Sequence, residues 1–201
     1  MSGAENPKRT AIVEAARTLF LESGYGATSM DQIAAVAEVS KRTVYSHFDG
    51  KDALFEGVMN GLCSRLAGGC PLGDDWQGRP EEVLTIAGRW LLTLITRPEA
   101  VALHRVVTGE SARFPQLGQM FFRMGPGRMI EQFARYLAAQ NTAGTLSVSD
   151  PEAAAARLLE MMRGPIHMPQ LLGLREPPDD AEIERTVDEA VRLFIAAHQP
   201  S

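Results

Sequence analysis

Residues 39–55, VSKRTVYSHFDGKDALF, place cations, hydroxyls, a phenol and an imidazole within one short helical stretch. A helix turns by about 100° per residue, so Val44 and Phe48 point in one direction and Ser46 points in the opposite one. Every position outside the Val44–Phe48 side can hydrogen-bond. Arg42 and Thr43 flank Ser46, Tyr45 and His47 project from the two edges, and Lys41 lies at the N-terminal end.

This outward face suits a DNA duplex. A helix in the major groove presents its first and central residues to base edges, where Arg pairs with guanine and small hydroxyls accept or donate. Side chains at the edges of the helix reach phosphates. Further phosphate contacts are expected from Lys51 and from the backbone amides of Thr28 and Ser29 at the start of the preceding helix.

The net charge of the chain is unfavourable for DNA binding, but the distribution of charge along the sequence favours it locally. The formal net charge of −5 and the pI near 5.4 repel nucleic acid, so contact with DNA requires a local cluster of cations. Residues 40–51 hold three cations and one acid, a local charge of +2, whereas residues 1–60 hold six cations and eight acids, or −2. The positive charge is therefore confined to the segment that carries the hydroxyls.

The helices that would position these groups are marked by capping signals. Asn6 before Pro7 is an N-cap followed by proline at the first helical position, and the first helix runs to about Ser23. Gly24 and Gly26 are expected to end it, since glycine adopts the left-handed conformation common at helix C-termini.

Three further helices follow closely. Thr28, with Asp31 three residues later, is expected to cap a second helix of about eight residues. Ser40 is expected to cap a third, and Asp49 with Asp52 a fourth. Two short helices joined by a tight turn, the second exposing cations and hydroxyls, describe a helix-turn-helix.

The rest of the chain predicts a second helical domain, so the expected fold is all-α. Residues 68–80, GGCPLGDDWQGRP, read as a linker between a DNA-binding domain at 1–67 and a helical domain at 81–201. Gly164-Pro165 is expected to interrupt a helix. The helices expected beyond the linker cover about 81–96, 98–109, 114–124, 126–140, 151–163 and 181–198.

Several classes of protein are not supported. There is no signal peptide pattern and no apolar run of membrane-spanning length, so a cytoplasmic protein without a membrane partner is expected. Cys63 and Cys70 match no zinc or disulfide spacing and read as ordinary thiols. His104, Glu110 and the Glu81-Glu82 pair lack a nucleophile or metal partner, so no catalytic residue, metal or cofactor is predicted.

The second domain offers a candidate pocket and a candidate dimer contact. The apolar stripes on 151–162 and 181–198 are expected to pack against their own domain and against a second copy of the chain. Large flexible apolar side chains and two histidines are expected to line a pocket for a small hydrophobic effector. These are Trp90, His104, Phe121, Phe122, Met124, Met161, Met162, His167 and Met168.

The chain also carries a resemblance. Residues 12–59, which include ARTLFLESGYGATSMDQIAAVAEVSKRTVYSHFDGKDALF, resemble the N-terminal DNA-binding domain of TetR-family transcriptional regulators, and Y-x-H-F-x-x-K is its most specific segment. GRWLLTLITRPEAVALHRVV, FPQLGQMFFRMGPGRM and MMRGPI are similar to the C-terminal domain of the AefR-like branch.

The resemblance implies a homodimeric, ligand-responsive repressor that binds a double-stranded operator with palindromic symmetry. It implies operator contacts at Thr28, Lys41, Arg42, Thr43, Tyr45, Ser46, His47 and Lys51. Glu38 departs from the family pattern, which usually has glycine in the turn. If this position needs a positive φ, a side chain there costs roughly 1 to 2 kcal/mol.

The sequence leaves two alternatives open. A helical protein-interaction module could use the same exposed face, and it would show little salt dependence, whereas DNA binding weakens steeply with salt. An enzyme is a more distant alternative, which a turnover screen with hydrophobic esters or ketones would test.

Overall fold

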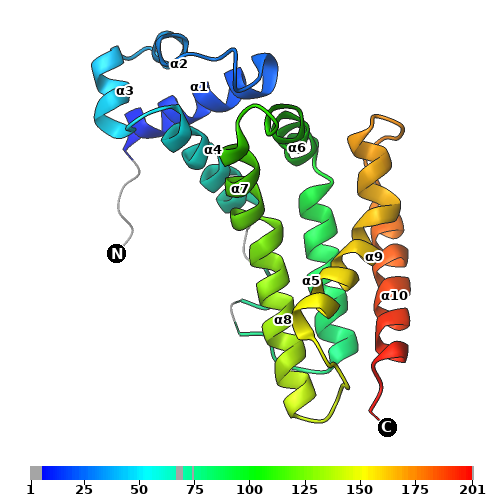
Figure 1. The fold of residues 1–201 in the computed structure, drawn as a ribbon. Coiled ribbons are helices and arrows are strands. Elements are labelled where there is room, and N and C mark those ends of the chain that lie inside the picture. The colour runs from blue at the N-terminus through cyan, green and yellow to red at the C-terminus, as the bar shows by residue number, and fades with distance from the viewer. Residues whose placement is uncertain (1–5, 67–69, 74, 201) are drawn as a thin grey trace. The chain divides into compact units, whose positions relative to one another are not determined.

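The computed structural model describes residues 6–66, 70–73 and 75–200, with the side chains of 62–66 excepted. Secondary structure within these residues is helical throughout, as predicted (Figure 1). The thiol of Cys63 and residues 67–69 and 74 of the expected linker lie outside the described residues. The helices are α1 (Pro7–Ser23), α2 (Met30–Val36), α3 (Lys41–His47), α4 (Lys51–Leu66), α5 (Pro80–Ile95), α6 (Pro98–Glu110), α7 (Pro115–Met124), α8 (Pro126–Thr142), α9 (Pro151–Leu171) and α10 (Asp180–Ala197).

The capping signals fix most of these boundaries. The Asn6 side chain accepts a hydrogen bond from the amide of Lys8 at the start of α1, and Ser40 caps α3 in the same way, both as predicted. Gly24 ends α1 with a φ of +83°, but Gly26 does not adopt a positive φ and serves another purpose, described below. Asp49 is not the N-cap of α4, because that helix starts only at Lys51.

The chain forms two compact units. The first comprises the residues up to Arg65 together with 102–124, and the second comprises 66–101 and 125–201. Residues 102–124, which the sequence places in the 81–201 domain, therefore pack with the N-terminal helices instead. Helix α6 begins in one unit and ends in the other.

The core of the first unit is built from apolar side chains of α1 to α4. Ile12, Phe20, Ile33, Val44 and Phe55 are all fully buried. Phe20 lies against the rings of Tyr25 and Phe55, with centroids 5.4 and 5.7 Å away. This core fixes the short helices α2 and α3, which are too short to be stable alone.

The second unit is a bundle of α5, α8, α9 and α10, whose apolar faces meet in one core (Figure 1). Gly88 allows α5 to approach closely, because a Cβ there would lie 2.8 Å from Val187 and 2.9 Å from Met162. Trp76, from the expected linker, is buried in this core and packs edge-on against Phe133. The described part of the linker is thus attached to the second unit.

Helix α9 differs from the prediction. It runs unbroken from Pro151 to Leu171 with Pro165 and Pro169 inside it. Pro165 is exposed, so water can satisfy the carbonyl whose backbone donor is missing. Ile166 and Gln170 are buried beyond it, and this packing carries the helix past the proline.

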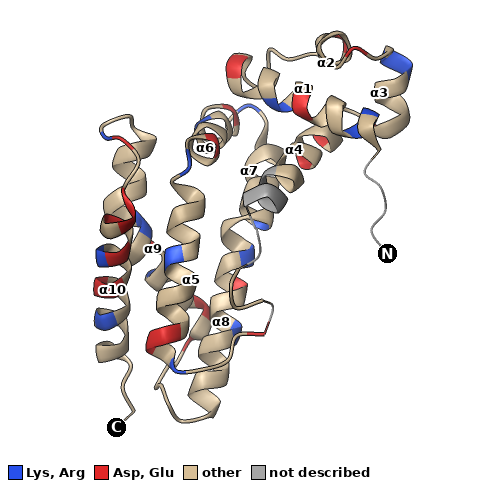
Figure 2. Ribbon diagram, turned by 180° about the vertical axis from the view of Figure 1, so that it is seen from behind, with Lys and Arg blue, Asp and Glu red and all other residues tan. Residues whose placement is uncertain are grey.

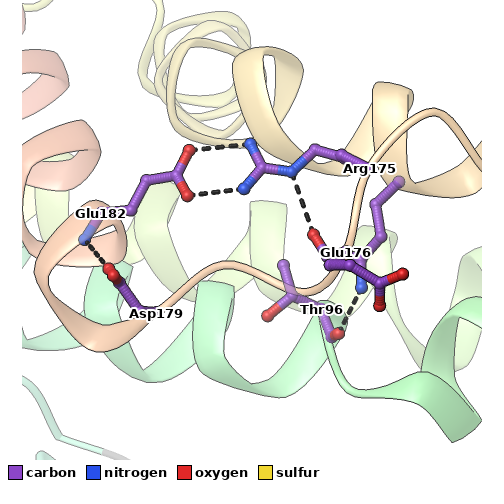
Figure 3. A network of polar contacts seen from close by, with 6 residues as sticks. Thr96, Arg175, Glu176, Asp179 and Glu182 are labelled. Atoms are coloured by element: carbon purple, nitrogen blue, oxygen red, sulfur yellow. Dashed lines mark hydrogen bonds and ion pairs between the residues drawn. The ribbon is translucent and has the colours of Figure 1, made fainter.

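A polar network secures the connection from α9 to α10 (Figure 3). Arg175 donates to both carboxylate oxygens of Glu182, at 2.7 and 2.5 Å, and Asp179 caps α10 by accepting from the Glu182 amide. No helix among the described residues has both the length and the apolar character needed to cross a bilayer.

Candidate DNA-binding surface

Helix α2 begins with a complete capping box at Ser29 and Gln32. The Ser29 hydroxyl accepts from the Gln32 amide, and the Gln32 side chain accepts from the Ser29 amide. Ser29, and not Thr28, is therefore the N-cap. The S-x-x-Q spacing of Ser29 and Gln32 is the sequence signal for this cap, and the expected pair of Thr28 and Asp31 does not form it.

Thr28 faces inward. Its side chain is buried, and its hydroxyl donates to the carbonyl oxygens of Gly24 and Leu19, at 2.8 and 3.2 Å. The hydroxyl is thus committed to the fold and is not offered to DNA. Only the backbone amide of Thr28 remains as a predicted phosphate contact.

The turn between α2 and α3 contains a non-glycine residue in the left-handed conformation. Glu38 has a φ of +53°, and Val39 donates its amide to the Ala34 carbonyl oxygen at 3.0 Å to close the turn. The turn therefore keeps the geometry that glycine would favour, and the side chain of Glu38 makes it strained.

Helix α3 has the two faces expected from its sequence. Val44 and Phe48 are buried, which fixes the rotation of the helix about its axis. Arg42, Tyr45 and Ser46 are exposed, and Thr43 and His47 are half-buried at the edges. The start of α3 is the cationic end of the helix (Figure 2).

The hydroxyls of α3 are ordered by local hydrogen bonds. Ser46 donates to the Thr43 carbonyl oxygen at 2.7 Å, and the Thr43 and Ser40 hydroxyls are 2.8 Å apart. An ordered hydroxyl still has lone pairs for an incoming donor. The Ser46 hydroxyl can therefore accept from amino groups of bases, whereas donation to phosphates and base carbonyls from this face falls to Arg42 and Tyr45.

Lys41 pairs with Asp31 in the first turn of α2. Its ammonium nitrogen lies 2.8 Å from one carboxylate oxygen and 3.1 Å from the other, and both side chains are exposed. The hydrogen bond that the Lys41 ammonium donates to Asp31 raises the pKa of Lys41. The pair joins the first turns of α2 and α3, and no local spacing predicts it because the two residues lie ten positions apart on either side of the turn.

Lys51 is bound to the turn before α2. Its ammonium donates to the carbonyl oxygens of Tyr25 and Thr28, at 2.8 and 2.9 Å, and lies 4.3 Å from the centroid of the Tyr25 ring. Burial lowers the pKa of Lys51. The structure thus uses Lys51 to hold the turn before α2, and its predicted role as a phosphate contact would require it to leave two carbonyls.

Two further features of this surface were not predicted from the sequence. Val36 on α2 is 52% exposed, although apolar side chains of a short helix are usually buried. The Arg9 guanidinium lies 5.0 Å from the centroid of Phe48 and covers the end of α3.

The predicted pocket residues are divided between the two units. His104, Phe121, Phe122 and Met124 belong to the first, where the His104 and Phe121 rings are 4.9 Å apart. Trp90, Met161, Met162 and His167 belong to the second. Met162 and His167 are buried, whereas Phe122, Met161 and Met168 are exposed, so these last three do not line an enclosed cavity within their own unit.

Comparison with known proteins gives the same assignment for both parts of the chain. The family model of bacterial regulatory proteins of the tetR family matches residues 12–58, which contain α2 and α3. The model of the AefR-like transcriptional repressor C-terminal domain matches residues 82–200.

Curated relatives match the N-terminal part. The transcriptional repressor DhaR of Mycobacterium sp. (strain GP1) is 38% identical over 63 residues, and the uncharacterized regulator YhgD of Bacillus subtilis is 37% identical over 59. These matches span 32% and 31% of the relatives, or about a third of their length.

Solved structures match along nearly the whole chain. The flavonoid-responsive regulator FrrA is 35% identical, with a TM-score of 0.83, over 96% of this chain and 97% of that one. A TetR-family transcriptional regulator from Pseudomonas syringae pv. tomato is 29% identical, with a TM-score of 0.76, over 98% and 99%. The protein belongs to the TetR family of bacterial transcriptional regulators, in its AefR-like branch, and is a DNA-binding regulator rather than an enzyme.

Proposed function

We propose that the protein is a ligand-responsive repressor that binds a palindromic operator as a homodimer and leaves it when a small hydrophobic effector binds. The recognition element is residues 41–48, inserted into the major groove. The observation that carries this proposal is the pair of faces on α3, where Val44 and Phe48 anchor the helix and Arg42, Tyr45 and Ser46 stand outward.

The direct contacts proposed are Lys41, Arg42, Thr43, Tyr45, Ser46 and His47. Arg42 is suited to guanine because its guanidinium can donate two parallel hydrogen bonds to O6 and N7. Lys41 and the edge residues Tyr45 and His47 are suited to phosphates. DNA binding of this kind would place the protein in the cytoplasm.

A homodimer is supported by exposed apolar side chains on α9 and α10. Met161 and Met168 are 37% and 53% exposed and share one face of α9, because they are spaced by seven residues, and Leu172, the C-cap residue of α9 four positions later, is 65% exposed. Leu193 on α10 is 49% exposed. Burying these side chains against a second copy would set the spacing of the two α3 helices near 34 Å or a multiple of it, as successive groove faces require.

The direction of regulation and the effector class are inferred from relatives. DhaR is named a repressor, and FrrA, similar over nearly the whole chain, is named flavonoid-responsive. We therefore place flavonoids first among the small hydrophobic effectors to test. Within the second unit, the half-buried Trp90 and the buried Met162 and His167 are the predicted pocket residues that could line the site. Release requires only that the effector prefer the arrangement that does not bind DNA.

DNA binding is tested by fluorescence anisotropy with duplexes from the region upstream of the protein's own coding sequence. The parent protein is expected to bind one of them with an affinity that falls steeply with salt. Arg42→Ala should cost about 1 to 3 kcal/mol and relax base preference at defined positions of that duplex. Arg97→Ala, which removes an exposed cation outside α3, is the control, and a loss equal to that of Arg42→Ala would contradict the assignment.

Effector binding is tested by thermal unfolding against a small library of flavonoids and other apolar molecules. A ligand present at 100 times its dissociation constant stabilises the folded state by about 2.7 kcal/mol. The same ligand should release the bound duplex in the anisotropy assay. A ligand that stabilises the protein without releasing DNA would contradict the proposed mechanism of induction.

A further inference from the structure

Residues 24–28 form the turn between α1 and α2, and this turn controls where α2 begins. It is followed at once by the Ser29 capping box, and α2 packs against α3. A shift of this turn would therefore move the helix that supports the recognition helix. Its backbone groups are held by side chains from elsewhere in the first unit.

Glu110, the last residue of α6, reaches this turn from far along the sequence. Its Oε1 accepts the amide hydrogen of Gly26 at 2.9 Å. Glycine on both sides of Tyr25 leaves room for the carboxylate, because a Cβ on Gly24 would lie 2.7 Å from Oε1 and one on Gly26 would lie 3.2 Å from Oε2. This close approach explains Gly26, which does not serve as the second left-handed glycine at the end of α1.

Phe114 supports the same turn next to Glu110. Its ring meets the Tyr25 ring edge-on with centroids 5.1 Å apart, and the Lys51 ammonium lies 5.9 Å from its centroid. Tyr25 also donates its hydroxyl to Asp52 in the first turn of α4. The turn is thus held by a carboxylate on its amide, an ammonium on its carbonyls and a ring against its aromatic side chain.

We propose that Glu110 is a positioning residue for DNA binding, which fixes the start of α2, and through it α3, by accepting the Gly26 amide. This assignment rests on the proposed DNA-binding role of α3. Glu110 does not belong to the recognition helix and carries the charge that DNA repels. If only net charge mattered, removal of Glu110 would raise the affinity for DNA. The proposed positioning role predicts that its removal lowers that affinity.

The test uses the full-length protein and the duplex bound by the parent, with three variants. Glu110→Ala removes the acceptor and the charge, Glu110→Gln removes the charge but keeps an oxygen acceptor, and Glu99→Ala removes an exposed acid at the other end of α6. Glu110→Ala should weaken DNA binding by about fivefold or more. Glu110→Gln and Glu99→Ala should stay within about twofold of the parent.

The salt dependence separates positioning from direct contact. A phosphate contact contributes about one unit to the slope of log affinity against log salt, and its loss reduces the slope. Glu110→Ala should leave the slope unchanged, whereas Lys41→Ala should reduce it. An unchanged affinity for Glu110→Ala, or an equal loss for Glu110→Gln, would overturn the proposal.

Hydrogen–deuterium exchange at the Gly26 amide distinguishes failure of this inference from failure of the DNA-binding proposal. Exchange should be faster in Glu110→Ala than in the parent and in Glu110→Gln, with or without DNA. If the parent binds no duplex but the Gly26 amide exchanges faster in Glu110→Ala, the contact between Glu110 and Gly26 is supported and the proposed DNA-binding role is wrong. If Gly26 exchanges equally in all variants, the contact itself is refuted.

Discussion

Lys41 at the start of α3 is already engaged by Asp31, so a phosphate must compete for it. We expect Asp31→Asn to free the ammonium and to raise affinity for unrelated duplex DNA by about two- to fivefold at low salt, the range of an exposed ion pair. Fluorescence anisotropy measures the change. Glu56→Gln, an equal loss of charge on an exposed position of α4, is the control. If both variants gain equally, net charge and not Lys41 explains the effect.

Tyr136 gives the second unit a dependence on alkaline pH. Its hydroxyl donates to the Gly78 carbonyl oxygen at 2.9 Å, and burial, with Glu81 and Glu82 nearby, raises the pKa of its phenol to about 12. The unfolded phenol ionises near pH 10, so the folded state holds a proton that the unfolded state has lost between these values. The stability that Tyr136 contributes is complete below about pH 10 and is lost as the pH rises toward 12.

We therefore expect Tyr136→Phe to lose less of its unfolding free energy than the parent between about pH 9 and 11. Near neutral pH the variant should be less stable by about 0.5 to 1.5 kcal/mol, the value of the lost hydrogen bond. Urea unfolding near neutral pH and at about pH 9 and 11 measures both effects. Parallel pH profiles for parent and variant would contradict the assignment of this titration to Tyr136.

Residue roles were predictable from the sequence where local periodicity decides them. Val44 and Phe48 are buried and Arg42, Tyr45 and Ser46 are exposed because the helical repeat fixes their directions. Thr28 and Lys51 could not be placed in this way. Their side chains are directed to carbonyls of the turn before α2, which is a tertiary arrangement that no spacing in the sequence records.

At the level of the elements, the turn between α2 and α3 contains backbone strain at Glu38 that a substitution can relieve. Glu38→Gly should raise the unfolding free energy by about 0.5 to 1 kcal/mol, because glycine relieves the left-handed penalty of 1 to 2 kcal/mol but loses more backbone entropy on folding. Glu38→Ala is the matched control, since alanine keeps the strain. Chemical denaturation of both variants tests this, and an equal gain for alanine would show that the acid and not the φ angle is responsible.

Helix boundaries were predictable to the extent that caps mark them. Asn6, Ser40 and the prolines at the first position of α5 to α9 mark starts close to those expected. The break expected at Gly164-Pro165 was wrong, because burial of Ile166 and Gln170 compensates for the proline and sequence alone does not show which residues pack. The sequence likewise did not indicate that residues 102–124 pack with the N-terminal helices. This grouping depends on contacts between residues far apart in the sequence, such as Glu110 and Gly26.

For the whole molecule, the acidic net charge of −5 opposes DNA binding, and two cationic α3 helix ends that bind together gain affinity over one. The proposed dimer supplies the second end. We expect Met168→Glu to place a charge in the apolar stripe of α9 and to shift the protein to monomer at micromolar concentration, because an unpaired buried charge is costly. Light scattering after size exclusion measures the mass.

Ile86→Glu, at an apolar position of α5 that is 40% exposed, is the control for that substitution. It should leave the mass unchanged, since α5 is not part of the proposed contact. Monomers in the parent, or dimers in Met168→Glu, would contradict the α9–α10 interface.

The grouping of residues 102–124 with the N-terminal helices sets a rule for exchanging parts between regulators. A chimera cut at the end of α4 would take the recognition helix but leave behind Glu110 and Phe114, the groups that hold the Gly26 amide and the Tyr25 ring. The transplantable module is thus discontinuous in sequence. A hybrid regulator built on this protein should carry 102–124 along with the first four helices, or be given an acid and an aromatic ring at matching positions in the recipient.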